Sequence, residues 1–184
     1  MSTDNEPTIS GPPAAGTEIE TLIGSLERQR GTFAWKCGGL DAAGLRATTA
    51  ATTMTLGGLL KHLALVEADY FCVKLVGRRP GPPWEAVDWE SDPDWEWRTA
   101  AEDTHEMLYG LWEESVARSR ANLTKALAEG DLGRSAQFAW PDGRTPSIRR
   151  MLVDIIEEYA RHVGHADLLR EAFDGLVGED PPAP

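Results

Sequence analysis

Two residues near the end of the chain, Glu158 and His162, have side chains and a spacing that suit metal binding. They stand four apart in a segment whose apolar residues repeat with a helical period, so both side chains lie on one side of the predicted helix. His162 falls within the apolar stripe, and at roughly 100° per residue Glu158 lies only about 40° to one side of it. A carboxylate or an imidazole that faces a core without a partner is costly. The two side chains therefore either bond to each other or share a cation.

A third ligand has to come from another helix. The chain has 4 histidines, and His62 is the one in the middle of a second predicted helix, beside its apolar face. One carboxylate and two imidazoles leave a coordination position open, which is typical of a catalytic zinc site rather than a closed structural one. The same donors also suit Fe(II), Ni or Co. His165, about 60° from His162 on the Glu158 side, and Asp154, one turn earlier, are candidates for outer contacts to the ligands.

Four long amphipathic helices would position these residues. Helix signals run from Thr17 to about residue 35, from Thr53 or Thr55 to about residue 77, from Thr99 or Thr104 to about residue 130, and from Ser147 to about residue 173. Each begins at a capping residue, and the first and last end before glycines. With no credible strand, the pattern predicts an all-α four-helix bundle. The long connection between the second and third helices leaves the order of directions open.

That connection, residues 77–97, has an unusual composition. Three prolines within residues 80–83 exclude a regular helix there, and four tryptophans follow in the same segment. A loop of this length is usually functional or packed on itself. We consider two interpretations, an Ω-like loop that covers the bundle and a lid over a small-molecule pocket. In the second, Trp84 and Trp89 would form pocket walls.

The ends of the chain predict a single domain with short extensions. Residues 1–14 are read as a disordered arm, residues 15–178 as one helical domain and residues 179–184 as a loose tail. The formal net charge of −12 argues against binding to nucleic acid or to anionic membranes. No run of about 18 apolar residues and no signal peptide occur, and two cysteines do not make a disulfide framework. A cytoplasmic location is the simplest interpretation.

Two motifs resemble the DinB-like superfamily. Residues 55–63 read Thr-x-x-Gly-x-Leu-x-His-Leu and resemble its second helix, while residues 158–171 resemble its last helix. A nearer similarity is to an actinobacterial branch of uncharacterised proteins, through Trp-Lys-Cys-x-Gly-Leu-Asp at residues 35–41 and Asp-Ile-Ile-Glu-Glu-Tyr-Ala-Arg-His at residues 154–162. The resemblance covers about residues 17–176. It implies an antiparallel four-helix bundle with a divalent metal between the second and fourth helices.

The resemblance also implies a ligand set and a chemistry. Carried over by position, the metal ligands are His62, Glu158 and His162. The glutamate at position 158 is similar to the one that the mycothiol-dependent maleylpyruvate isomerases have at the first position of this motif. Relatives with assigned activities are thiol S-transferases that use mycothiol, bacillithiol or glutathione. The chain lacks the separate C-terminal domain of the isomerases, so we expect a substrate other than maleylpyruvate.

The leading hypothesis is a zinc-dependent S-transferase that joins a low-molecular-weight thiol, such as mycothiol, to an electrophilic small molecule. Tyr159 and His165 are the candidate contacts to this cofactor. One alternative is a metal-dependent hydrolase in which Glu67 takes a proton from bound water. Another is a non-enzymatic, stress-associated helical bundle. Whether the protein forms a homodimer is left open.

Overall fold

The computed structural model describes residues 9–181, and the regular elements among them are all helical, which confirms the all-α class. Within these residues, no helix combines the length and hydropathy that crossing a membrane requires. The elements are α1 (Glu18–Cys37), α2 (Ala42–Arg46), α3 (Leu56–Glu67), the π-helical segment η1 (Ala68–Lys74), the 3₁₀ turn η2 (Trp84–Ala86), α4 (Trp95–Thr99), α5 (His105–Ala128) and α6 (Ile148–Asp174).

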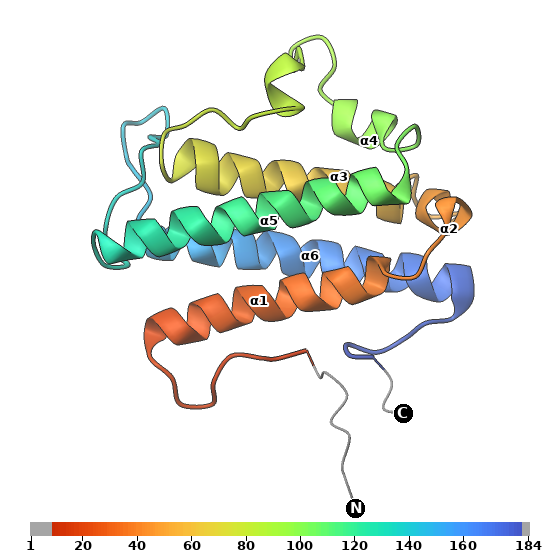
Figure 1. Ribbon diagram of the computed structural model, residues 1–184, viewed down its shortest axis with the longest axis horizontal. Helices are drawn as coiled ribbons and strands as arrows, with labels where there is room; N and C mark the ends of the chain where they lie inside the picture. The colour runs from red at the N-terminus through yellow and green to blue at the C-terminus, as the bar shows by residue number, and fades with distance from the viewer. Residues whose placement is uncertain (1–8, 182–184) are drawn as a thin grey trace, which may run out of the picture.

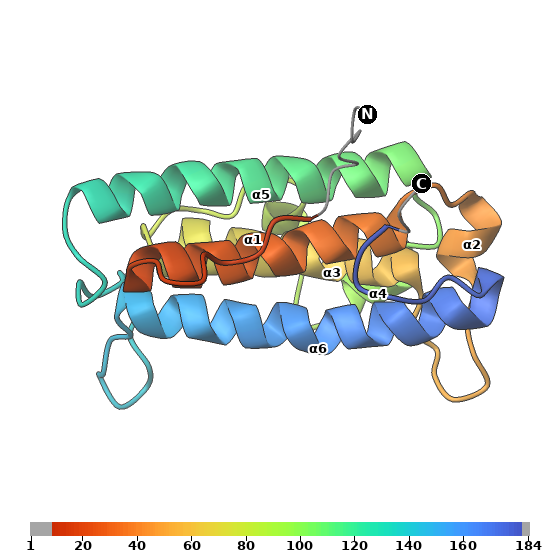
Figure 2. The ribbon, with the colours of Figure 1, turned by 90° about the horizontal axis from the view of Figure 1, so that it is seen from below.

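The four long helices α1, α3, α5 and α6 lie side by side (Figures 1 and 2). The colours of Figure 1 show α1 and α6 running in one direction and α3 and α5 in the other. The most extensive contacts join α1 to α6 and α3 to α5. The two helices of each of these pairs run in the same direction. The chain must therefore travel the length of the bundle between α3 and α5, which explains the long connection. The arrangement departs from simple up-and-down order, but α3 and α6 remain antiparallel.

Side-chain caps begin each of the long helices at positions that the sequence indicated. Each capping hydroxyl accepts a backbone N–H from the first helical turn; the caps are Thr17, Thr55, Thr104 and Ser147. Thr17 and Glu20 form a reciprocal capping box. Gly175, with φ of 78°, ends α6 in the left-handed conformation that glycine adopts without strain.

The second predicted helix contains a change of winding. After Glu67, α3 passes into η1, where the N–H of Leu75 donates to the carbonyl of Tyr70 at 2.9 Å, five residues back. The wider turn leaves carbonyl groups free for other donors. Ser119 and Asn122 of α5 supply these donors. Their side chains donate to the carbonyls of Glu67 and Phe71, both at 3.2 Å. The π turn is thus held by α5.

A buried ion pair runs through the apolar core. Nε and Nη2 of Arg30 donate to the two carboxylate oxygens of Glu67 at 2.8 and 2.7 Å, and neither side chain is more than 2% exposed. The hydroxyl of Tyr159 donates to Glu67 Oε1 at 2.7 Å and accepts from Trp112 Nε1 at 2.9 Å. Side chains from α1, α3, α5 and α6 therefore meet in one hydrogen-bonded group.

The described parts of the predicted arm and tail contact α1. Nη1 of Arg28 donates to the carbonyl of Ile9 at 2.6 Å, and its guanidinium forms a two-point pair with Asp180. The carbonyl of Glu179 accepts from Thr32 at 3.2 Å. Residues 1–8 of the predicted arm and 182–184 of the predicted tail lie outside the described residues.

The tryptophan-rich connection is packed rather than extended. Trp84 is 1% exposed, and its ring meets that of Trp95 edge to face with centroids 6.0 Å apart. Trp89 meets the same ring at 6.3 Å. The connection also contains α4, which lies against α3 (Figure 1). This short helix places the side chains of Trp95, Glu96 and Trp97 over the middle of α3.

Candidate metal centre

Three side chains from two helices meet on one side of the bundle. His62 comes from α3, while Glu158 and His162 come from α6, where they stand one turn apart. The two helices pack against each other in opposite directions, and the ring centroids of His62 and His162 lie 4.8 Å apart. One ligand atom from each side chain lies within 4.8 Å of the other two. The structure therefore brings together the three residues that the sequence singled out.

The two imidazoles share one carboxylate oxygen. Nε2 of His62 lies 3.3 Å from Oε1 of Glu158, and Nε2 of His162 lies 3.1 Å from the same oxygen. Ligand atoms held about 2.0–2.2 Å from one tetrahedral ion stand about 3.4 Å apart, so these two nitrogen–oxygen separations are close to those of a metal site. Two imidazole nitrogens and one carboxylate oxygen suit zinc and its neighbours among the transition metals. The residues present fit a divalent metal with one position left for another ligand.

The outer atoms of Glu158 and His162 also have partners. Nδ1 of His162 lies 3.3 Å from Nδ1 of His165, so one of these two rings can donate to the other. Oε2 of Glu158 accepts from Nη1 of Arg161 at 2.9 Å. These contacts orient the atoms that face inward, namely His162 Nε2 and Glu158 Oε1. His165 thus lies beside the cluster, where the sequence analysis expected an outer contact.

The electrostatics favour the ligand forms of both α6 residues. Burial alone would raise the pKa of Glu158, but the hydrogen bonds and charges of His62 and His162 outweigh burial and lower it. Burial is the main reason why the pKa of His162 is lowered; the charge of His62 acts in the same direction, and Glu158 opposes it. An ionised carboxylate and a neutral imidazole are the forms that bind metals.

The cluster is only partly covered. The side chains of His62 and Glu158 are 18% and 23% exposed, and that of His162 is 9% exposed. The ring of Trp97 stacks on His62, with centroids 4.6 Å apart and an interplanar angle of 25°. A small molecule can therefore approach Glu158 from solvent, while the imidazole of His62 is covered on one face.

Two neighbours of the cluster were missed by the sequence analysis. Glu96 is 5% exposed, and its Oε1 lies 3.2 Å from Nδ1 of His62. Trp97 follows it in α4 and provides the stacking ring. The only sequence signal for either was the concentration of tryptophan in this connection. Nothing in the spacing indicated that Glu96 would reach a histidine 34 residues earlier.

Tyr159, expected to contact a cofactor, faces the core instead. Its side chain is completely buried, and its hydroxyl is already bonded to Glu67 and Trp112. Burial, followed by the charge of Glu67, raises the pKa of this phenol well above its ordinary value. A ligand at the cluster cannot reach Tyr159 without rearrangement of the core. Glu67, the base considered for a hydrolase, is equally enclosed and paired with Arg30.

Trp84 and Trp89, predicted as pocket walls, and Asp154, predicted as an outer contact, all lie outside the cluster. Trp84 and Trp89 line a cavity of about 330 Å³ with residues of α3 and η1, and none of the three clustered residues lines it. Asp154 forms an ion pair with Arg150 at 2.7 Å. Trp97 is therefore the aromatic residue of this connection that contacts the histidines.

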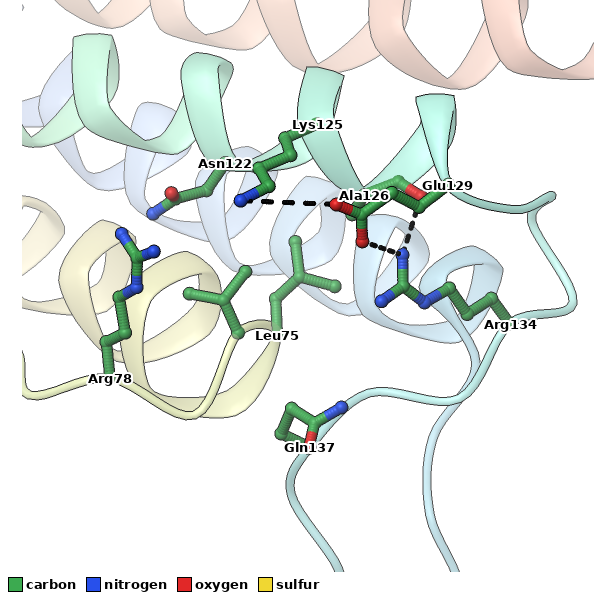
Figure 3. Close-up of a pocket in the computed structure, with 9 residues that line it drawn as sticks. Leu75, Arg78, Asn122, Lys125, Ala126, Glu129, Arg134 and Gln137 are labelled. Atoms are coloured by element: carbon green, nitrogen blue, oxygen red, sulfur yellow. Dashed lines mark hydrogen bonds and ion pairs between the residues drawn. The ribbon is translucent and has the colours of Figure 1, made fainter.

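A smaller cavity of about 160 Å³ lies at the C-terminal end of α5 (Figure 3). The three predicted ligands do not line it. Three of its lining side chains are cationic: Arg78, Lys125 and Arg134. Arg134 donates to the carbonyl of Ala126 and to Glu129, both at 3.0 Å, and Lys125 lies 4.0 Å from the same carboxylate. Cations at this position offset the negative end of the helix dipole. This charge therefore stabilises the end of α5.

A comparison with curated proteins found no match to the chain. The sequence profile of the mycothiol-S-transferase family, by contrast, matches residues 21–175, a range that includes all three residues of the cluster and both helices that carry them. The matched range covers nearly all of the helical bundle. The chain therefore belongs to the mycothiol-S-transferase family, a DinB-like family.

Proposed function

We propose that this protein is a metal-dependent S-transferase that joins the sulfur of mycothiol, or a similar low-molecular-weight thiol, to an electrophilic small molecule. The observation that carries the proposal is the meeting of His62, Glu158 and His162 with their ligand atoms within 4.8 Å of one another. Membership of the mycothiol-S-transferase family supports the choice of thiol.

The three residues would hold a divalent metal through two neutral imidazoles and one carboxylate. Bound there, such an ion would supply a Lewis acid that stabilises the thiolate of the cosubstrate. Zinc is the metal that we expect, and Ni, Fe(II) or Co would accept the same donors. In the reaction, the thiol releases its proton to solvent water, a sulfur–carbon bond forms at the electrophile, and any displaced group leaves with the electrons of the broken bond.

Residues around the cluster have supporting roles in this proposal. Arg161, bonded to Oε2 of Glu158, directs Oε1 of that carboxylate toward the two imidazoles. His165 lies at the edge of the cluster and would contact the bound thiol cosubstrate. The two cysteines, Cys37 and Cys72, are buried free thiols, in keeping with the cytoplasmic location that we propose. A homodimer remains a proposal that light scattering can test.

The enclosure of Glu67 makes the hydrolase alternative less attractive, because a base for bound water must reach the cluster. The non-enzymatic alternative finds some support in the direct contacts between Glu158 and the two imidazoles, which satisfy these groups without a metal.

The decisive experiment measures metal content in protein purified without a histidine tag. We expect about one equivalent of metal in the wild-type protein and little in Glu158→Ala or His162→Ala, because two ligands do not retain what three bind. His105→Ala is a matched control, since this histidine lies at the start of α5 and is not among the three clustered residues. Full retention of metal in both ligand variants would refute the site.

The transferase activity has its own measurement. The metal-loaded protein is incubated with a test electrophile and with mycothiol, bacillithiol or glutathione in turn, and loss of free thiol is followed. Thiol consumption that depends on both metal and enzyme supports the proposal. Metal binding without activity toward any thiol would leave the metal centre and remove the transferase.

A further inference from the structure

Glu96 is a buried carboxylate whose hydrogen bonding is incomplete. It is 5% exposed, its Oε1 faces Nδ1 of His62 at 3.2 Å, and its Oε2 has no hydrogen-bond partner among the described residues. Removing a carboxylate from water without full compensation is costly. A glutamate held in this way stabilises the fold poorly, so its contact with His62 is the feature that needs an explanation.

The helix that carries Glu96 holds His62 and its neighbour from outside. Trp97 stacks on the imidazole of His62 at 4.6 Å. The ammonium of Lys61 lies 4.2 Å from the ring centroid of Trp95 and donates to the hydroxyl of Thr99 at 2.8 Å. The contacts of α4 thus fix both the position of this turn of α3 and the plane of the His62 ring.

The contact between Glu96 and His62 also distinguishes the two nitrogens of the imidazole ring. Nδ1 faces Glu96, and Nε2 faces Oε1 of Glu158 inside the cluster at 3.3 Å. An ionised carboxylate can only accept a hydrogen bond, so Glu96 favours the form of the ring that carries its proton on Nδ1. Oε1 of Glu158 is also an acceptor and favours the opposite form in the metal-free protein, so Glu96 shifts the balance between the two forms. In the form with the proton on Nδ1, the lone pair of Nε2 points toward the other two residues of the cluster. Partners of this kind fix the tautomer and the orientation of metal-binding histidines.

We propose that Glu96 is a positioning residue for the metal centre: it accepts a hydrogen bond from Nδ1–H of His62 and thereby presents Nε2 as a ligand. The proposal rests on the metal centre proposed above. It also gives the tryptophan-rich connection a specific task, because α4 brings Glu96 and Trp97 onto a histidine of α3.

The test compares two variants with one control. Glu96→Gln keeps the size of the side chain, but an amide can donate as well as accept and so no longer selects one tautomer. Glu96→Ala removes the contact. Glu90→Gln removes the same charge from an exposed position in the same connection and serves as the control. Nitrogen-15 spectra of the metal-free proteins, at a pH where the ring is neutral, report the tautomer of His62. Competition with a chelator reports zinc affinity.

We expect a larger population of the Nδ1–H tautomer in the wild-type protein and in Glu90→Gln than in either Glu96 variant. Zinc affinity should fall by about 10- to 100-fold in Glu96→Ala and by less in Glu96→Gln. An unchanged tautomer in Glu96→Gln would overturn the proposal whatever happens to affinity, since a merely structural residue would have that result.

The two proposals can fail separately. If the wild-type protein binds no zinc, the metal centre is refuted, and the tautomer comparison in the metal-free protein still decides whether Glu96 orients His62. If Glu96→Ala does not fold, Glu96→Gln gives the decision, with its melting temperature in the absence of metal as the measure of folding.

Discussion

At the scale of single residues, the ion pair of Arg30 and Glu67 depends on both partners being present. The guanidinium is 2% exposed and the carboxylate is fully buried, and they are joined by two hydrogen bonds. Removing one member leaves the other charged and buried, which typically costs about 3–5 kcal/mol of folding free energy. We expect Glu67→Ala to lose stability of this order in urea unfolding.

Glu27 offers a matched control for that variant. It also bonds to Arg30, at 2.7 Å, but its side chain is 32% exposed and water can replace it. Glu27→Ala should therefore cost at most about 1 kcal/mol. Equal losses in the two variants would show that the buried pair carries no special weight.

Tyr159 makes a prediction about alkaline pH. Burial raises the pKa of this phenol well above the ordinary value near 10, so above pH 10 the unfolded chain loses a proton that the folded protein keeps. The unfolded state then binds fewer protons, and stability falls as pH rises. This contribution is fully present below about pH 10 and is lost progressively above it.

Tyr159→Phe removes that proton and should flatten the decline. Well above pH 10, the slopes of unfolding free energy against pH should differ between the two proteins by about 1.4 kcal/mol per pH unit, the value for one proton. Tyr70 and Tyr109, whose pKa values burial raises to about 12, titrate in both proteins and cancel in the comparison. Urea unfolding between pH 8 and about pH 11.5 measures the slopes; parallel curves would contradict the assignment.

At the scale of elements, the long helices could be predicted because their signals are local. A hydroxyl cap, an apolar stripe and a terminal glycine each act within a few residues, so α1, α5 and α6 begin and end close to the expected positions. The π-helical winding of η1 has no such signal, because side chains of α5 satisfy its carbonyls. The helix α4 is only five residues long and depends on contact with α3.

Two glycines in the helices that carry the cluster should respond in opposite ways to a methyl group. A Cβ added at Gly164 of α6 would meet only open space, whereas a Cβ at Gly58 of α3 would come within 2.9 Å of Trp97 Cε3. We expect Gly164→Ala to raise stability by up to about 1 kcal/mol, because alanine favours the helix. Gly58→Ala should lower stability and displace Trp97 from His62.

Thermal unfolding and near-ultraviolet circular dichroism measure these two effects. The aromatic signal should change in Gly58→Ala and stay constant in Gly164→Ala. A stabilised Gly58→Ala protein with an unaltered aromatic spectrum would mean that α4 does not pack tightly on this turn.

At the scale of the whole molecule, the cluster joins elements far apart in the chain, and this decides how much of it could be predicted. Glu158 and His162 are one turn apart and His162 lies in the apolar stripe, so the local pattern singled them out, and His62 followed from its place in the middle of a helix. The resemblance to the DinB-like superfamily implied the same three residues. Glu96 could not be found in this way, since its approach to His62 depends on how a long connection returns over α3. Periodicity predicts the face of a helix but not what a loop lays upon it.

A metal at this position would tie α3 to α6 and so stabilise the bundle as a whole. Binding to the folded state alone adds about 2.7 kcal/mol when free zinc is one hundred times its dissociation constant. For a chain of this size, that corresponds to a rise of about 5–10 °C in melting temperature. Scanning calorimetry with and without zinc should show the rise in the wild-type protein and in His105→Ala, but not in His62→Ala or His162→Ala. A bundle in which Glu158 merely bonds to the two imidazoles predicts no rise in any of these proteins, because hydrogen bonds already present in the absence of zinc gain nothing from its addition.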